Sequence, residues 1–192
     1  MMRRDNVLRT LAKYRTNEVV LTTMSTAQEW PAFSQNEFDF NARGTGMGHL
    51  PDMGLGLAVA CPDRKVLILN GDGSMLMNLG VLVTIANAAP RNLILFVFEN
   101  EIYEVTGGQP IPGRGRANFA AMAKGAGFAH TFEFDELATF DKELPQLLKL
   151  DGPLFVTVKA APSGKPLSTK AVPVLAASRA LRDTLSKSRP RH

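Results

Sequence analysis

The 192-residue sequence contains a single cysteine, Cys61, and this scarcity excludes several kinds of site. One cysteine can form neither an internal disulfide framework nor a multi-cysteine zinc or iron–sulfur centre. The chain also lacks an apolar run of about 18 residues, and residues 1–22 carry charges throughout, unlike the apolar core of a signal peptide. We therefore expect a soluble protein of the reducing cytoplasm, with no membrane partner.

Charge is also sparse, because 21% of the residues are charged whereas 45% are hydrophobic. This composition is typical of a globular chain that buries one sizeable core. Much of the excess behind the formal net charge of +4 lies at the two ends, and no basic stripe alternates with aromatic side chains. We therefore expect no nucleic-acid partner, and the basic balance favours anionic small molecules.

Apolar strand-like runs alternate with helical segments along most of the chain. The strand-like runs are 18–23, 65–70, 92–98, 128–131 and 153–158. The helical segments are 3–15, 50–61, the stretch after Ser74 to about Asn87, 117–125, 135–150 and 173–185, while 34–48 is typical of an irregular loop. This alternation predicts an α/β fold with a doubly wound, mostly parallel sheet flanked by helices. We expect one domain at residues 1–160 and a linker with a C-terminal helix or tail at 161–192, the linker composition itself covering 159–170.

The sequence Gly71-Asp72-Gly73-Ser74 stands where the apolar strand at 65–70 gives way to a helix. Glycines on both sides of an aspartate allow a sharp turn that brings backbone N–H groups close to a ligand, and a helix N-terminus favours negative charge. Asp72 supplies a carboxylate oxygen, the ligand type that Mg²⁺ prefers when it also binds phosphate oxygens. The pattern indicates a diphosphate and magnesium site, although Gly-Asp-Gly also occurs in ordinary turns.

Asn100 follows the next apolar strand, with 26 residues between Gly73 and Asn100. Because this interval contains one helix and one strand, a single crossover would return Asn100 to a position beside Asp72. In parallel sheets the ligand crevice lies beyond the carboxyl ends of the strands. The amide oxygen of Asn100 and the backbone carbonyl of Ile102 are therefore candidate metal ligands together with Asp72.

These residues resemble the thiamine diphosphate motif, which runs from Gly-Asp-Gly through the next strand to an Asn. The resemblance extends over roughly residues 18–160 to the C-terminal, diphosphate-binding domain of phosphonopyruvate decarboxylases and of sulfopyruvate decarboxylase beta subunits. The segments that carry it are Met47-Gly48, Gly54 to Ala58, Gly71 to Ser74, Leu76 to Gly80, Ala89 to Leu93, Asn100-Glu101 and Thr106 to Gln109. The sequence departs from the commonest pattern at Glu99, where Asn or Asp often stands, and at Thr45 and Ile102, where Gly is expected.

The resemblance implies thiamine diphosphate and Mg²⁺ as cofactors. It implies Asp72, Asn100 and the carbonyl of Ile102 as metal ligands. The cofactor-binding positions that it implies are Thr45, Met47, Gly71, Gly73, Ser74 and Ile102. In the family, an apolar residue at the position of Met47 supports the bent conformation of the cofactor, and a backbone carbonyl, here that of Thr45, accepts a hydrogen bond from the aminopyrimidine.

The resemblance further implies that part of the catalytic machinery is elsewhere. The glutamate that activates the aminopyrimidine belongs to a pyrimidine-binding domain in the family, and only residues 1–17 precede the first strand that we predict. We therefore expect the base on a separate pyrimidine-binding subunit, in a hetero-oligomer or homo-oligomer with at least two copies of each chain. The implied reaction is decarboxylation of a small 2-oxo acid that carries a phosphonate or sulfonate.

Several polar residues are candidates for contact with such a substrate. The possible direct contacts are His49, Tyr103, Thr106 and Gln109, and the cations that could meet a second anionic group are Arg43, His49, Arg114, Arg116 and Lys124. An Arg or Lys is usually a solvated surface charge, and the alternative explanation for His49 is that it caps the following helix. The other three polar residues are equally explained by loop packing.

Other functions share part of the same pattern. An acetolactate synthase-like carboligase subunit would use every cofactor residue named above, and a non-catalytic cofactor-binding protein could keep them. A 2-oxo acid oxidoreductase beta chain usually brings cysteines, and this chain has one. An unrelated nucleotide-binding module is disfavoured because both Gly-x-Gly-x-x-Gly after a first strand and Gly-x-x-x-x-Gly-Lys-Ser/Thr are missing.

Overall fold

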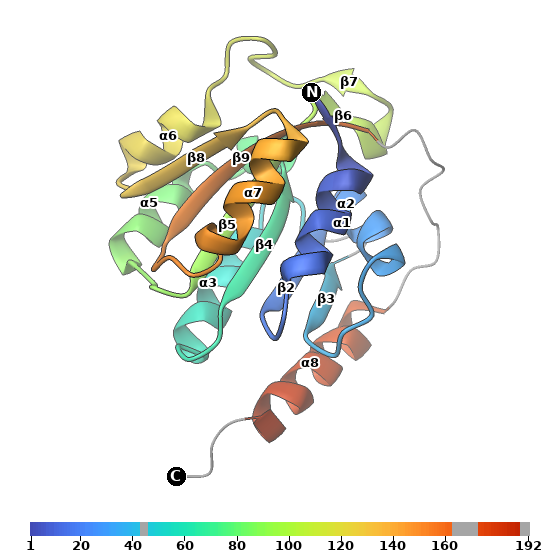
Figure 1. Cartoon of the computed structure of the whole chain (residues 1–192), viewed down its shortest axis with the longest axis vertical. Coiled ribbons are helices and arrows are strands. Elements are labelled where there is room, and N and C mark those ends of the chain that lie inside the picture. Colours follow the sequence, from blue (N-terminus) through green and yellow to red (C-terminus); the bar gives the residue numbers. More distant parts are fainter. Residues whose placement is uncertain (43–45, 163–172, 189–192) are drawn as a thin grey trace.

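The computed structural model describes residues 1–42, 46–162 and 173–188, and has a central sheet flanked by helices (Figure 1). The seven strands of the sheet are β1 (Met2–Arg3), β2 (Val19–Thr23), β3 (Asp39–Ala42), β4 (Val66–Gly71), β5 (Leu93–Glu99), β8 (His130–Phe134) and β9 (Leu154–Ala161). The helices are α1 (Arg4–Tyr14), α2 (Met24–Glu29), α3 (Leu50–Ala60), α4 (Asp72–Leu76), α5 (Gly80–Ala88), α6 (Phe119–Ala126), α7 (Leu137–Leu147) and α8 (Val174–Ser188). Short 3-10 turns, η1 (Trp30–Ala32) and η2 (Glu104–Thr106), and a hairpin of β6 (Ile102–Tyr103) and β7 (Gln109–Pro110) complete the described elements.

Every strand pair of the main sheet is parallel, in the order β1-β9-β5-β4-β2-β3, and β8 also pairs with β9. Strand β2 lies between β3 and β4, so the chain continues to one side of β2 with β3 and then to the other side with β4. Such a reversal is a topological switch point, where ligands bind beyond the carboxyl ends of the strands. The predicted doubly wound parallel fold is confirmed.

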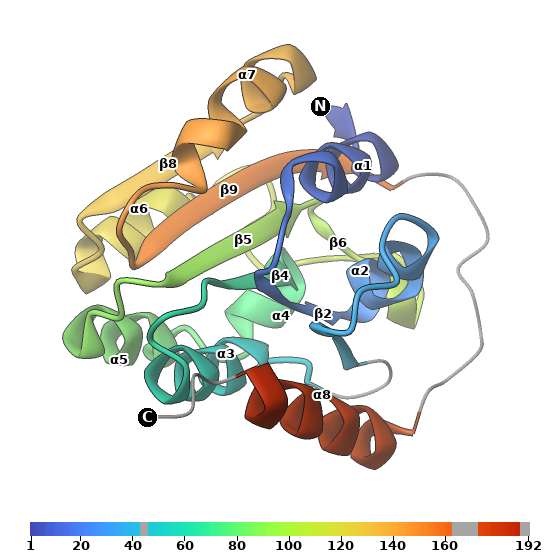
Figure 2. The same ribbon diagram turned by 60° about the horizontal axis from the view of Figure 1, so that its bottom comes forward.

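The central strands are buried on both faces because helices cover both sides of the sheet. In β4, Val66 and Ile68 belong to one apolar cluster, whereas the intervening Leu67 and Leu69 belong to the other. Helices α1 and α7 cover one face, and α3, α5 and α8 lie on the opposite side (Figure 2). This double burial explains why these strands are continuous apolar runs rather than alternating ones.

Small residues allow α3 to approach the sheet closely. A Cβ atom added at Gly54 would lie 2.2 Å from Cδ1 and 2.6 Å from Cγ1 of Ile68 on β4. Gly56 faces away, where an added Cβ would meet nothing within 4 Å. The glycine at position 54 therefore sets the distance between helix and sheet, and with it the position of the loop that leads into α3.

The structure corrects three details of the sequence prediction. Residues 34–48 are not wholly irregular, because 39–42 form β3, which pairs with β2 at the edge of the sheet. The helical stretch after Ser74 is divided into α4 and α5. The predicted linker begins too early, because β9 continues to Ala161. The part of that linker at 163–170 lies outside the described residues.

The predicted C-terminal helix is present as α8 and packs against the body of the fold. Leu181 and Leu185 are 3% and 8% exposed and belong to the apolar cluster that also contains Phe38 and Phe40. The division into a domain at 1–160 and a separate tail remains a prediction. Among the described residues, no helix combines the length and the apolar character that crossing a bilayer requires.

Candidate functional site

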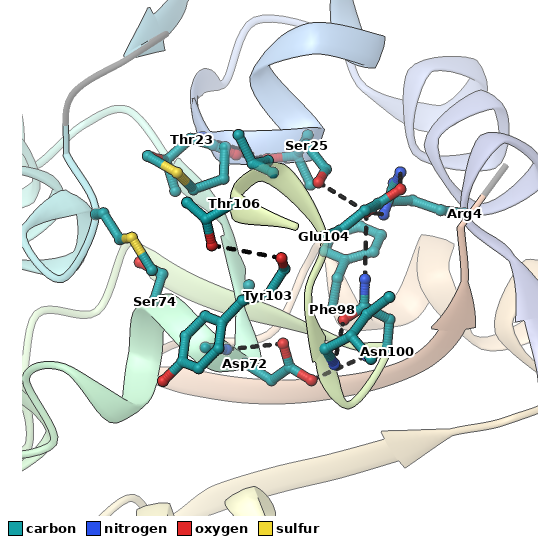
Figure 3. Close-up of a pocket in the computed structure, with 17 residues that line it drawn as sticks. Arg4, Thr23, Ser25, Asp72, Ser74, Phe98, Asn100, Tyr103, Glu104 and Thr106 are labelled. Atoms are coloured by element: carbon teal, nitrogen blue, oxygen red, sulfur yellow. Dashed lines mark hydrogen bonds and ion pairs between the residues drawn. The ribbon is translucent and has the colours of Figure 1, made fainter. Parts of the chain in front are cut away.

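The candidate site lies at the switch point, where β2, β4 and β5 end at the same edge of the sheet. Gly71 at the end of β4 is the register partner of Phe98 on β5, so the residues that follow these two strands emerge side by side. A partly open cleft lies here (Figure 3), and its empty space, open solvent included, is about 480 Å³. It is lined by Arg4, residues 23–26, Met47, residues 71–74, Phe98, Asn100 and residues 102–106.

The carboxylate of Asp72 holds the two strand ends together. Its Oδ1 accepts a hydrogen bond from the backbone N–H of Gly73 at 2.7 Å, and its Oδ2 accepts from Asn100 N at 3.0 Å and Glu101 N at 2.6 Å. Asp72 is 2% exposed. Burial raises its pKa above the ordinary value, and the hydrogen bonds from backbone N–H groups only partly oppose this effect. The predicted return of Asn100 to Asp72 across one crossover is therefore confirmed.

Asn100 begins a tight turn over the cleft. Its amide Oδ1 accepts from the backbone N–H of Ile102 at 3.1 Å, and its Nδ2 donates to Oε2 of Glu104 at 3.3 Å. Glu101 has the left-handed φ of 63°, and Met24, on the other wall, has a φ of 50°. Non-glycine residues held in this region tend to cluster at functional sites, because the surrounding structure must enforce them.

Close approaches explain the glycine and serine of the motif. A Cβ atom at Gly73 would lie 2.5 Å from Cε1 of Tyr103, so the ring of Tyr103 packs directly on the glycine backbone. Ser74 is buried, and its hydroxyl accepts from the backbone N–H of Gly48 at 2.9 Å, which connects the segment of Met47 to the motif. Sequence positions 47–48, 71–74 and 100–106 thus form one surface.

A buried ion cluster closes one end of the cleft. Arg4 is 2% exposed and binds Glu29 through two hydrogen bonds of 2.8 Å. It also binds Glu104, through NH1 to Oε2 at 2.6 Å and NH2 to Oε1 at 3.0 Å (Figure 3). Burial alone would lower the pKa of Arg4, but its hydrogen bonds to both carboxylates outweigh burial and raise it. Burial would raise the pKa of Glu104, but Arg4, aided by a hydrogen bond from Ser25, lowers it.

Most of the predicted cofactor and metal residues line the cleft. They are Met47, Gly71, Asp72, Gly73, Ser74, Asn100 and Ile102, and among the candidate substrate contacts Tyr103 and Thr106. Thr45 and Arg43 lie outside the described residues. Sequence reasoning missed Arg4, Met24, Ser25 and Glu104, because an arginine near a helix start or a glutamate in a polar loop carries no local signal.

The remaining candidates for substrate contact do not line the cleft. His49 is 77% exposed and its ring lies 2.9 Å from Asp52, without capping α3 through its side chain. Arg114 is 59% exposed and 3.7 Å from Glu101. Gln109, Arg116 and Lys124 are likewise exposed and lie outside the cleft lining. Among the described residues that line the cleft, Arg4 is the positively charged one. Its guanidinium already forms ion pairs with Glu29 and Glu104.

The oxygen donors at this edge fit a hard divalent cation and a phosphorylated cofactor. The carboxylate of Asp72 is a hard oxygen donor of the type that Mg²⁺ prefers, and backbone N–H groups hold it in place at this edge. The amide oxygen of Asn100 and the carbonyl of Ile102 are of the same chemical type. Fold and site together define an α/β domain that binds a phosphorylated cofactor at a switch point.

Comparisons with known proteins identify the family. Residues 18–158 match the family described as thiamine pyrophosphate enzyme, C-terminal TPP binding domain. The chain belongs to this family and is a thiamine diphosphate-binding domain. The resemblance inferred from Gly71-Asp72-Gly73 and Asn100 is thereby confirmed.

Curated relatives refine the comparison. The chain is 37% identical to the sulfopyruvate decarboxylase subunit beta of Methanocaldococcus jannaschii over 127 residues, which cover 66% of each chain. It is 40% identical to the same subunit of Methanothermobacter thermautotrophicus over 116 residues, 60% of this chain and 59% of that one. The phosphonopyruvate decarboxylase of Streptomyces hygroscopicus is 33% identical over 144 residues, 75% of this chain and 35% of the relative. The matched region thus spans at most 66% of these relatives.

Solved structures agree on the fold. A benzoylformate decarboxylase from Polynucleobacter necessarius superposes with a TM-score of 0.68 at 24% identity, over 86% of this chain and 34% of that one. A thiamine diphosphate-dependent 4-hydroxybenzoylformate decarboxylase from Rhodococcus jostii RHA1 gives 0.68 at 20% identity, over 83% and 32%. At 20–24% identity this similarity shows the fold alone.

Proposed function

We propose that this chain is the diphosphate- and Mg²⁺-binding subunit of a thiamine diphosphate-dependent 2-oxo acid decarboxylase of the sulfopyruvate or phosphonopyruvate type. The observation that carries the proposal is the contact of Asp72 with the backbone of Asn100 at the ends of adjacent strands. Asp72, Asn100 and the Ile102 carbonyl would bind Mg²⁺, and Gly73, Ser74 and Met47 would contact the cofactor. Thiamine diphosphate would supply the electron sink that decarboxylation of a 2-oxo acid needs.

The proposal includes a separate subunit that carries the pyrimidine-binding half and its glutamate. The two carboxylates in the described lining of the cleft, Asp72 and Glu104, are already engaged by backbone N–H groups and by Arg4. We therefore assign neither carboxylate as the base that activates the aminopyrimidine. The designation "subunit beta" of two relatives supports a hetero-oligomer. The single cysteine is compatible with the cytoplasmic location that we also propose.

Calorimetric titration with thiamine diphosphate, with and without Mg²⁺, tests the cofactor site. We expect Mg²⁺-dependent binding that Asp72→Ala abolishes, because this change removes the buried carboxylate. Asp63→Ala, at an exposed position in the turn after α3, is the matched control and should bind normally. Equal binding without Mg²⁺, or by the Asp72 variant, would contradict the proposed metal site.

A second assay addresses the reaction. The chain combined with a pyrimidine-binding subunit should release CO₂ from sulfopyruvate or phosphonopyruvate and form the corresponding aldehyde, whereas either chain alone should not. Product analysis distinguishes this outcome from carboligation, in which two 2-oxo acids would give a longer hydroxy acid. Ligation as the main product would favour the carboligase alternative over the decarboxylase.

A further inference from the structure

The buried cluster of Arg4, Glu29 and Glu104 connects three parts of the chain that are distant in sequence. Arg4 begins α1, Glu29 ends α2, and Glu104 lies in η2 beyond Asn100. Their side chains are 2%, 9% and 17% exposed, respectively. Removing charged groups from water to this extent is costly, and good geometry and additional hydrogen bonds must compensate for it. The burial of these charges therefore suggests a role beyond attaching α1 to the fold.

Arg4 fixes the carboxylate of Glu104 in one orientation. Two donors of the planar guanidinium bind its two oxygens, NH1 to Oε2 at 2.6 Å and NH2 to Oε1 at 3.0 Å. The hydroxyl of Ser25 donates to Oε2 as well, at 2.8 Å. The same oxygen accepts from Nδ2 of Asn100 at 3.3 Å. Oε2 is thus held in place by two donors and faces the Asn100 amide.

An acceptor in this place favours one orientation of the Asn100 amide, the same orientation that the N–H of Ile102 favours. A carboxamide can present either its NH₂ group or its oxygen to a neighbour, but an ionised carboxylate only accepts hydrogen bonds. The NH₂ group of Asn100 must therefore face Glu104, and its oxygen lies on the other side of the amide. There it accepts from the N–H of Ile102 at 3.1 Å.

We infer that Glu104, held by Arg4, is a positioning residue that presents the amide oxygen of Asn100 for metal binding. This inference rests on the proposed function, because it assigns Asn100 as a ligand of the proposed Mg²⁺. Arg4 precedes residues 18–158, the part of the chain that matches the family. Helix α1 therefore contributes to the geometry of the site from outside that region, as Figure 3 shows for Arg4 and Glu104.

A purely structural cluster would only tie α1 and α2 to the loop, and a double-mutant cycle separates the two roles. The variants are Glu104→Gln, Asn100→Asp and both together. Glutamine can turn a donor toward Asn100 and thus permits the wrong amide orientation. Aspartate at position 100 presents an oxygen in either orientation, so it makes the orienting group unnecessary.

The affinity for Mn²⁺ at saturating thiamine diphosphate is the readout, measured from the electron paramagnetic resonance signal of free Mn²⁺. Glu104→Gln should weaken Mn²⁺ binding by about 10–100-fold, the usual effect of losing a residue that orients a metal ligand. In the Asn100→Asp background the same substitution should cause no loss. An equal loss in both backgrounds would overturn the inference.

Glu29→Gln is the matched control, because Glu29 also binds Arg4 but is absent from the lining of the cleft. Its Mn²⁺ affinity should stay within about 3-fold of the wild type, far less than the 10–100-fold expected for a lost orienting residue. If Glu104→Gln and Glu29→Gln bind Mn²⁺ equally well, the inference fails while the proposed function stands. If the wild-type chain shows no metal-dependent binding of thiamine diphosphate, both fail together.

If Glu104→Gln does not fold, a measurement on the wild-type chain tests the inference instead. The side-chain NH₂ resonances of Asn100 can be assigned by NMR from their disappearance in Asn100→Asp. One of the two protons should be shifted downfield and protected from solvent exchange, since it is hydrogen-bonded to the carboxylate of Glu104. Two rapidly exchanging, unshifted protons would overturn the inference.

Discussion

Replacing Arg4 with methionine removes the buried cation that Glu29 and Glu104 share. Methionine is unbranched and flexible, so it fills much of the space of the arginine side chain without its charge. Arg4 makes four hydrogen bonds to these two carboxylates, at 2.6 to 3.0 Å. The substitution would leave two nearby carboxylates, 9% and 17% exposed, without their common partner.

The expected loss follows from this burial. Removing one partner of a buried ion pair typically costs about 3–5 kcal/mol, because the remaining charge stays desolvated. For a chain of this size each kcal/mol lowers the unfolding midpoint by about 2–4 °C, so the midpoint should fall by about 6–20 °C. Equilibrium unfolding in urea, followed by the fluorescence of the single tryptophan, Trp30, measures the loss. Arg3→Met is the matched control, since the Arg3 side chain is 55% exposed. It should leave the free energy of unfolding and the thermal midpoint nearly unchanged.

The loss should also depend on pH. Arg4 holds the pKa of Glu104 below its ordinary value of 4.5 despite burial. A lowered folded-state pKa stabilises the protein above the unfolded-state value, and this stabilisation disappears as the pH falls through the folded-state pKa. The difference between wild type and Arg4→Met should therefore be largest at neutral pH and shrink toward pH 4. A difference that is the same at both pH values would refute the electrostatic reasoning, as would a loss below about 1 kcal/mol at pH 7, the range of exposed pairs.

Two glycine substitutions test the close approaches. Gly73→Ala would place a Cβ 2.5 Å from the ring of Tyr103, so it should displace that ring and weaken the binding of thiamine diphosphate in calorimetric titration, and unchanged affinity would contradict the packing. Gly54→Ala would place a Cβ 2.2 Å from Ile68 Cδ1, and we expect a loss of about 1–3 kcal/mol in urea unfolding. On the same helix, Gly56→Ala meets nothing within 4 Å and should stabilise α3 by up to about 1 kcal/mol, so a gain at both positions would show that Gly54 does not limit the approach of α3.

The contact between Asp72 and Asn100 could be predicted from sequence because its geometry follows from topology. Asp72 and Asn100 each stand directly after an apolar strand, and one crossover between neighbouring parallel strands suffices to join them. No comparable rule places Arg4 beside Glu104. These two residues are 100 positions apart, and their pairing depends on how α1 and η2 pack at the edge of the sheet.

The same distinction explains which parts of the fold were missed. Strands β4 and β5 are buried on both faces and appear in the sequence as continuous apolar runs. Strand β3 is a four-residue edge strand, half of whose residues are buried, and the sequence after it contains Gly44, Gly46 and Gly48. Its pairing with β2 is a tertiary effect with little local signal. The break between α4 and α5 falls at Met77-Asn78-Leu79, directly before Gly80, which begins α5.

Asp72 illustrates how the fold accommodates a group that stability alone would disfavour. Its pKa is raised by burial above the ordinary value of 3.8. A raised folded-state pKa means that the contribution to stability is present below pH 3.8 and is lost as the pH rises through the folded-state value. At neutral pH the ionised carboxylate is therefore a net cost to the free protein, and hydrogen bonds from backbone N–H groups reduce this cost. A divalent cation would favour the ionised form, so the proposed ligand offsets the cost at the position where the two strand ends meet.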